Sequence, residues 1–212
     1  MRNLIFLVCL CLPVQALAQA GSGPFGFEAG MTRERLVQIV DEGAIKELDA
    51  DTLLLSTAPR PHGEFESYAL RFFPEKGLLK IIAASKEIPS DAFGNELKSV
   101  YKAIKEELTG LYGKPNHTMD LLNNGSIWFG PGDWMTALFK RDRFLACSWI
   151  DTPLPDGIQF IRLDAGAKSK EVGFLNITYE FTGLAEYMKA QGSAPADSQP
   201  DRDVSPAKSN RK

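Results

Sequence analysis

The apolar residues between positions 93 and 115 recur at three- and four-residue steps, and this spacing constrains the fold more than any other feature. At 3.6 residues per turn, such positions fall on one stripe of a helix. The stripe consists of Phe93, Leu97, Val100, Tyr101, Ile104, Leu108, Leu111 and Tyr112. Gly113 stands where helices commonly end in a left-handed conformation, and Pro115 then prevents continuation. We predict one long amphipathic helix whose apolar stripe faces a core.

Pairs of strand-like runs lie on both sides of this helix. Residues 65–73 and 78–84 flank a Pro- and Gly-containing turn, which suits a four-residue hairpin. In the first run, the apolar set Tyr68, Leu70 and Phe72 is expected to face the long helix. Residues 135–140 and 144–150 form a second expected pair, residues 157–164 and 172–181 a third, and residues 53–57 a further strand. Because parallel strands need long crossovers, these short connections indicate an antiparallel sheet.

Shorter helices are predicted at both ends of the folded region. Thr32 is a suitable N-cap for a helix over residues 33–42, with Met31 placed to pack on Leu36 and Gly43 as its stop. Residues 183–190 have the pattern of a terminal helix. The prediction is a single α+β domain over residues 21–190, in which an antiparallel sheet of six to eight strands packs on the long helix.

The first twenty residues have the pattern of a secretory signal peptide. Arg2 supplies the charged start, residues 4–12 form a short apolar run, and cleavage is expected after Ala18 or Ala20. The run is too short to span a bilayer, which needs about 20 residues. Neither Cys9 nor Cys11 follows the small residue that a lipid-attachment site needs. We therefore expect a periplasmic or secreted protein without stable membrane insertion.

Removal of the leader would leave Cys147 as the one remaining cysteine, so no internal disulfide is expected. Cys147 lies in an apolar run and is predicted to be a core residue. Residues 191–212 contain no aromatic residue, and Val204 is their one large aliphatic residue, so we predict a disordered tail. A role for this tail as a tether or docking peptide stays open. The net charge of −3 offers no basic field for nucleic acid.

The residues that usually carry catalysis or bind metals are sparse. His62 and His117 occupy loops without the spacing of metal ligands, and no nucleophile elbow or phosphate-binding glycine loop occurs. We predict no metal and no cofactor. Four carboxylates lie in expected loops, namely Asp120, Asp133, Asp151 and Asp156. Two of them meeting in space would give the acid and base of a hydrolase, so the enzyme alternative stays open.

The most informative polar stretch is residues 125–134. Trp128, Phe129 and Trp134 surround a Gly-Pro-Gly turn, and Asp133 stands beside them. Rigid aromatic side chains of this kind can anchor a partner. The competing interpretation turns Trp128 and Trp134 inward, where they close one end of the sheet. Trp128, Phe129, Asp133 and Trp134 are therefore the candidate binding residues.

Two resemblances accompany these patterns. Gly30-Met31-Thr32, followed by a short amphipathic helix, resembles the start of small bacterial envelope domains such as the assembly lipoprotein BamE and the β-lactamase inhibitory proteins. A longer set of motifs is similar to a family of secreted bacterial proteins to which no function is attached: Gly77-Leu78, Tyr112-Gly113-Lys114-Pro115 and Gly125-Ser126-Ile127-Trp128. The first resemblance implies an envelope-associated α+β domain and suggests inhibition of a secreted enzyme.

The functional hypothesis is a non-catalytic periplasmic or secreted binding module that uses the aromatic loop to contact a protein or envelope component. The alternatives are a hydrolase that uses loop carboxylates and an inhibitor of a secreted enzyme. Nothing in the sequence fixes the oligomeric state.

Overall fold

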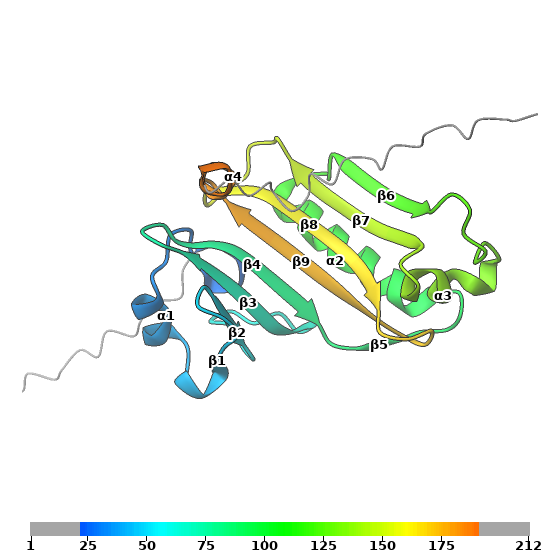
Figure 1. The fold of residues 1–212 in the computed structure, drawn as a ribbon, viewed down its shortest axis with the longest axis horizontal. Helices are drawn as coiled ribbons and strands as arrows, with labels where there is room; N and C mark the ends of the chain where they lie inside the picture. Colours follow the sequence, from blue (N-terminus) through cyan, green and yellow to red (C-terminus); the bar gives the residue numbers. More distant parts are fainter. Residues whose placement is uncertain (1–21, 191–212) are drawn as a thin grey trace, which may run out of the picture.

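The structure, a computed structural model, describes residues 22–190 (Figure 1). The predicted signal peptide at residues 1–20 and the predicted tail at residues 191–212 lie outside the described residues. The described residues form an α+β fold built on one large antiparallel sheet, which confirms the predicted class. The sheet has nine strands, more than the six to eight predicted.

Eight strands follow one another across the sheet in the order β1-β2-β3-β4-β9-β8-β7-β6, and β5 pairs with β9 beside β4. Their bounds are β1 Ile45–Glu47, β2 Thr52–Leu55, β3 Phe65–Phe73, β4 Gly77–Ser85, β5 Ile88–Pro89, β6 His117–Leu122, β7 Arg143–Ile150, β8 Ile158–Ala167 and β9 Val172–Phe181. The predicted hairpins at residues 65–84 and 157–181 are confirmed as β3/β4 and β8/β9. The pairing of β4 with β9 joins the two halves of the chain.

The second predicted hairpin is wrong. Residues 135–140 do not pair with β7, because they belong to helix α3 (Trp134–Phe139), and β7 instead pairs with β6 and β8. Every residue from Trp134 to Leu138 is buried, including the polar Thr136, so this short run has no exposed face. A short run that is buried on every side has no periodicity that distinguishes a strand from a helix. The expected strand pairing failed for that reason.

Three other helices complete the fold: α1 (Arg33–Ile39), α2 (Asn95–Tyr112) and α4 (Leu184–Ala190). Three short 3₁₀ turns accompany them: η1 (Pro24–Gly26), η2 (Glu42–Ala44) and η3 (Pro131–Asp133). The Thr32 hydroxyl accepts a hydrogen bond from the Arg35 backbone N–H at 3.2 Å, as expected of an N-cap. Helix α1 ends at Ile39, three residues before the predicted end, because Val40 is already extended. Within residues 22–190 no helix is long and apolar enough to cross a membrane.

Helix α2 lies across β8 and β9 (Figure 1) and contacts both strands and β5. Its buried residues are Leu97, Tyr101, Ile104 and Leu108. Two other members of the predicted stripe are exposed, namely Phe93, which precedes the helix, and Leu111 near its end. Trp149 and Cys147 of β7 are buried in the core, as predicted. The helix therefore covers only part of the sheet.

The β3 side of the sheet is covered by the N-terminal segment, residues 22–40. Tyr68 is buried as predicted, but its ring contacts Phe25 and Phe27, at centroid distances of 4.9 and 6.3 Å, rather than lying against α2. Two different elements thus cover the same face of the sheet, and the space between them determines where the candidate site lies.

Candidate ligand groove

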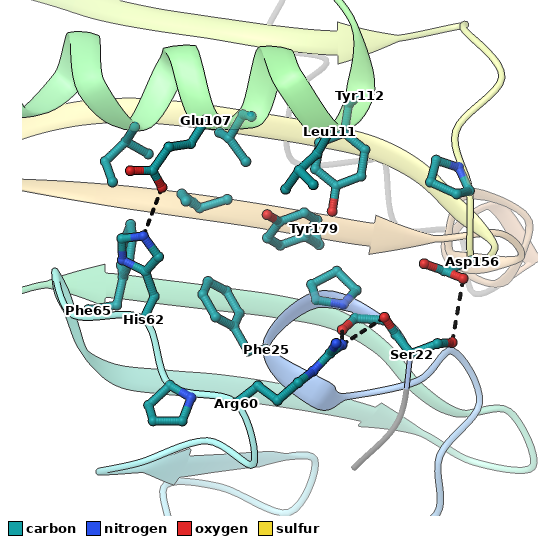
Figure 2. Close-up of a pocket in the computed structure, with 17 residues that line it drawn as sticks. Ser22, Phe25, Arg60, His62, Phe65, Glu107, Leu111, Tyr112, Asp156 and Tyr179 are labelled. Carbon is teal, nitrogen blue, oxygen red and sulfur yellow. Dashed lines mark hydrogen bonds and ion pairs between the residues drawn. The ribbon is translucent and has the colours of Figure 1, made fainter.

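A groove separates the second half of helix α2 from the N-terminal segment (Figure 2). Its cavity has a volume of about 390 Å³. Ile177 and Tyr179 of β9 contribute to its lining, as do Ile104, Leu108, Leu111 and Tyr112 of α2 and Phe25, Phe65 and Pro61 from the opposite side. These side chains are predominantly aromatic or aliphatic. The polar groups of the groove gather at its two ends.

Phe25 owes its position to an uncommon backbone conformation. Its φ of 55° and ψ of 16° lie in the left-handed region, which is disfavoured for a residue with a Cβ atom. The ring is held between Tyr68 of β3 and Tyr179 of β9, at centroid distances of 4.9 and 5.9 Å. Packing between aromatic rings offsets the backbone strain, and such strain is often found where a binding site needs a side chain in a fixed place.

A contact between His62 and Glu107 closes one end of the groove. His62 Nε2 lies 2.9 Å from Glu107 Oε2, so the loop after β2 is joined to helix α2. His62 Nδ1 accepts a hydrogen bond from the Glu64 backbone N–H at 3.2 Å, which assigns the ring proton to Nε2. Both ring nitrogens are therefore engaged, and neither is available to take a proton from a substrate.

Arg60, Ser22 and Asp156 form the other end (Figure 2). Arg60 Nη2 donates to the backbone carbonyl oxygens of Ser22, at 2.7 Å, and Gly23. The Arg60 backbone N–H also donates to the Phe25 carbonyl oxygen at 3.0 Å. Across from this residue, the Ser22 hydroxyl lies 3.5 Å from Asp156 Oδ1. These contacts fasten the N-terminal segment to two loops and fix the width of the groove.

Tyr112 and Tyr179 meet nearer the Arg60 end of the groove than the His62 end (Figure 2). Their ring centroids are 6.2 Å apart, with the ring planes inclined at 63°. Burial raises the pKa of Tyr179 well above its ordinary value, and Tyr112 adds to that rise. Burial also raises the pKa of Tyr112, an effect opposed by the hydrogen bond to Tyr179. Both phenols are therefore neutral at physiological pH and act as hydrogen-bonding groups inside an apolar groove.

The sequence-predicted binding residues do not form a continuous aromatic surface. Trp134 is buried, with Lys98 Nζ 4.2 Å from its ring centroid, so it follows the inward interpretation. Asp133 Oδ2 accepts a hydrogen bond from the Gly130 backbone N–H at 3.1 Å, and this carboxylate therefore shapes the loop. Trp128 is half-buried, whereas Phe129 is 80% exposed. Phe129 is the one member of this set that presents most of its side chain to solvent.

The four carboxylates expected in loops have separate local roles, and for Asp120 the expected loop is wrong, because Asp120 lies in strand β6. Asp120 forms an ion pair with Arg143, Asp133 caps η3, and Asp156 lies beside Ser22. Asp151 follows β7 with a φ of 51° and takes part in the turn there. Among residues 22–190, no group of three or more His, Cys, Asp or Glu side chains is arranged to hold a metal ion.

Sequence reasoning missed the groove, although one signal was present. The predicted helix stripe included Leu111 and Tyr112, two large side chains at the very end of the helix, and these now line the groove. The remaining residues could not be grouped in advance, because Phe25, Arg60 and Tyr179 are far apart in sequence and meet only through the pairing of β4 with β9.

Comparisons with known proteins add no further identification. No protein-family model, no curated protein and no solved structure matches the chain. The resemblances noted in the sequence therefore stay predictions.

Proposed function

We propose that the chain is a non-catalytic binding protein of the periplasm or secreted space that takes an apolar ligand into the groove. The observation that carries this proposal is the cavity of about 390 Å³ with predominantly aromatic and aliphatic walls. Cavities of about 300 to 1,000 Å³ with apolar walls and a few polar groups are characteristic of small-molecule sites. The location depends on the predicted signal peptide.

The groove is held open before any ligand arrives. The His62–Glu107 contact fixes one end, and the Arg60 contacts with Ser22 and Gly23 fix the other. A preformed site loses less conformational freedom on binding, and affinity rises accordingly. In this proposal, β9 of the sheet and the second half of α2 both contact the ligand.

The polar groups of the groove support binding rather than catalysis. His62 already uses both ring nitrogens, so it has none left to activate a hydroxyl group or a water molecule. Hydrolysis by a pair of carboxylates gains no support from the structure. Asp120 is in an ion pair with Arg143, Asp133 accepts a hydrogen bond from the Gly130 backbone, and Asp156 lies beside Ser22.

Binding of N-phenyl-1-naphthylamine, a neutral fluorescent apolar molecule, tests the proposal. Leu111 is 70% exposed and lines the groove, so Leu111→Asn removes apolar contact area without disturbing the core. Burial of a leucine side chain contributes about 1.5 to 3 kcal/mol, so the dissociation constant should rise about tenfold or more. Phe129→Asn is the matched control, because Phe129 is also mostly exposed but lies outside the groove.

Saturable one-to-one binding that Leu111→Asn weakens and Phe129→Asn leaves unchanged is the expected result. Absence of saturable binding, or equal loss in the two variants, would refute the groove as the ligand site.

A second contact surface is proposed at the predicted aromatic loop. Ile127 and Phe129 are 71% and 80% exposed, and Met119 and Leu121 on the edge strand β6 are also exposed. Exposed apolar side chains of this size favour contact with a protein or envelope partner. Cross-linking at position 129 in intact cells tests this idea. A discrete adduct that Ile127→Ser removes supports it, and monomeric protein alone contradicts it.

A further inference from the structure

Two charged groups of the groove have no oppositely charged partner among residues 22–190. One is Asp156, whose neighbour at 3.5 Å is the uncharged Ser22 hydroxyl. Arg60 uses Nη2 on two backbone carbonyl oxygens, and within residues 22–190 its guanidinium has no carboxylate partner. An arginine carries its charge at every physiological pH and presents several N–H donors in a fixed plane. The Arg60 end of the groove therefore holds one cation with unused donors and one carboxylate, that of Asp156.

A second donor lies at the same end. Tyr112 carries a phenolic hydroxyl that can donate a hydrogen bond, and its ring lies beside that of Tyr179, with the centroids 6.2 Å apart. Apart from the Tyr179 hydroxyl, no partner for this donor is found in the described part of the chain. Figure 2 shows Tyr112 across the groove from Arg60, toward Ser22 and Asp156, with His62 and Glu107 at the opposite end. A guanidinium and a phenol thus both offer donors to one end of an apolar cavity.

We propose that the groove selects an amphipathic carboxylate, with its apolar body along Phe25, Leu111 and Tyr179 and its carboxylate at the Arg60 and Tyr112 end. This inference rests on the proposed function and adds the chemical class of the ligand. A carboxylate fits the free side of an arginine, and a charge-assisted hydrogen bond is roughly twice as strong as a neutral one. The apolar body replaces water along the aromatic and aliphatic walls.

Asp156 gives the proposal a distinctive consequence. Its carboxylate lines the same end of the groove and repels a ligand of like charge. Asp156→Asn removes that repulsion and keeps a side chain that can accept the hydrogen bond from Ser22. Binding of a carboxylate ligand should therefore become tighter in this variant, whereas binding of a cationic ligand would become weaker.

The test compares decanoate with 1-decanol, which share the same apolar chain length, by displacement of N-phenyl-1-naphthylamine from the full-length protein. We expect decanoate to bind at least tenfold more tightly than decanol. Arg60→Gln should abolish that difference. Because the Arg60 contacts also hold the N-terminal segment, the decanol affinity of the same variant measures any change in the groove itself, and the ratio of the two affinities is the readout. Arg60→Lys should retain part of the preference. Lys102→Gln is the control, because it removes one positive charge from the exposed side of α2.

Four outcomes can be separated. Preference for decanoate that depends on Arg60 and increases in Asp156→Asn supports the inference. Equal binding of decanoate and decanol overturns the inference but leaves the groove proposal standing. Preference for decanoate that Lys102→Gln removes as strongly as Arg60→Gln also overturns it, because general charge would then explain the result. Displacement by neither compound, with no binding of the fluorescent molecule, contradicts the proposed function itself.

Discussion

The two halves of helix α2 lie over the same sheet but have different environments. In the first half, Leu97 is completely buried against β9, where a Cβ atom added to Gly173 would lie 2.5 Å from Leu97 Cδ2. In the second half, Leu111 is 70% exposed, and Leu111 and Tyr112 line the groove. The same amphipathic pattern thus packs into the core in the first half of the helix and lines the groove in the second half.

The difference arises from what each half meets. The first half packs closely because Gly173 leaves room for Leu97, and because Trp134 of α3 lies against Gly94 just before the helix begins. The second half faces the bulky Tyr179 and an N-terminal segment held at a distance by the Arg60 and His62 contacts. The comparison shows that the covering element, rather than the helix sequence alone, decides whether an apolar stripe is buried.

Leucine truncation in the two halves should produce the largest contrast. Leu97→Ala should lower the free energy of unfolding by about 2 to 5 kcal/mol, because it leaves a cavity in a closed core. Leu111→Ala should change it by about 0.5 kcal/mol or less, because the side chain is already exposed. Urea unfolding of both variants measures the difference. Similar losses would show that the groove half is as tightly packed as the core half.

Glycine replacement should give the next largest effect. Gly94 has a φ of 74°, and an added Cβ atom would lie 2.2 Å from the Trp134 ring. Gly94→Ala should therefore destabilise the fold by about 1 to 3 kcal/mol through overpacking. Gly110 has open space around it in the groove half, so Gly110→Ala should stabilise the helix by about 0.5 to 1 kcal/mol. Thermal unfolding distinguishes the two, and opposite shifts in Tm are the expected result.

Alkaline pH should weaken the fold through its buried tyrosines. The pKa of Tyr179 is raised above the ordinary value of 10.0 by burial. Its contribution to stability is therefore full below pH 10.0 and is lost as pH rises from there through the folded-state pKa. Tyr179→Phe should flatten this decline more than Tyr112→Phe, because Tyr179 is the more deeply buried phenol. Urea unfolding midpoints of both variants, measured from pH 8 to 11, test this ranking. A flatter decline in Tyr112→Phe than in Tyr179→Phe would contradict it.

Acidic pH should lower the stability of the fold through Glu96 in the first turn of α2, and this is the smallest effect that we predict. Backbone N–H groups lower the pKa of Glu96, chiefly that of Asp91, and the Ser90 hydroxyl adds to this shift. The carboxylate therefore stabilises the fold above its ordinary pKa of 4.5, and the contribution is lost as pH falls through the lower folded-state value. Glu96→Gln should reduce stability at pH 7 and make it less sensitive to acid. Parallel acid curves for the two proteins would contradict this assignment.

Much of the fold was predictable because it is encoded locally. Thr32 caps its helix, and the Pro74 to Gly77 turn joins β3 to β4 as predicted. Residues 134–139 were not predictable as a helix, since a short run that is buried along almost its whole length has no diagnostic period. The two interpretations of Trp134 were separated only by the tertiary contact with Gly94.

The candidate site was less predictable than the fold. It depends on Phe25, Arg60 and Glu107, which occupy an N-terminal turn, a loop and a helix. No short motif joins such residues, and neither the left-handed backbone of Phe25 nor the distance between α2 and the N-terminal segment can be read from a periodic pattern. Only the excess apolar side chains at the end of the predicted stripe pointed toward it.

Amide chemical-shift mapping with N-phenyl-1-naphthylamine tests the central claim most directly. Two-dimensional ¹H–¹⁵N spectra of the isotope-labelled protein would be recorded during titration. The account predicts saturable shifts concentrated at residues 22–25, 60–65, 104–112 and 177–179, with residues 95–101 almost unchanged. Shifts concentrated at residues 127–129, or spread evenly along α2, would contradict it.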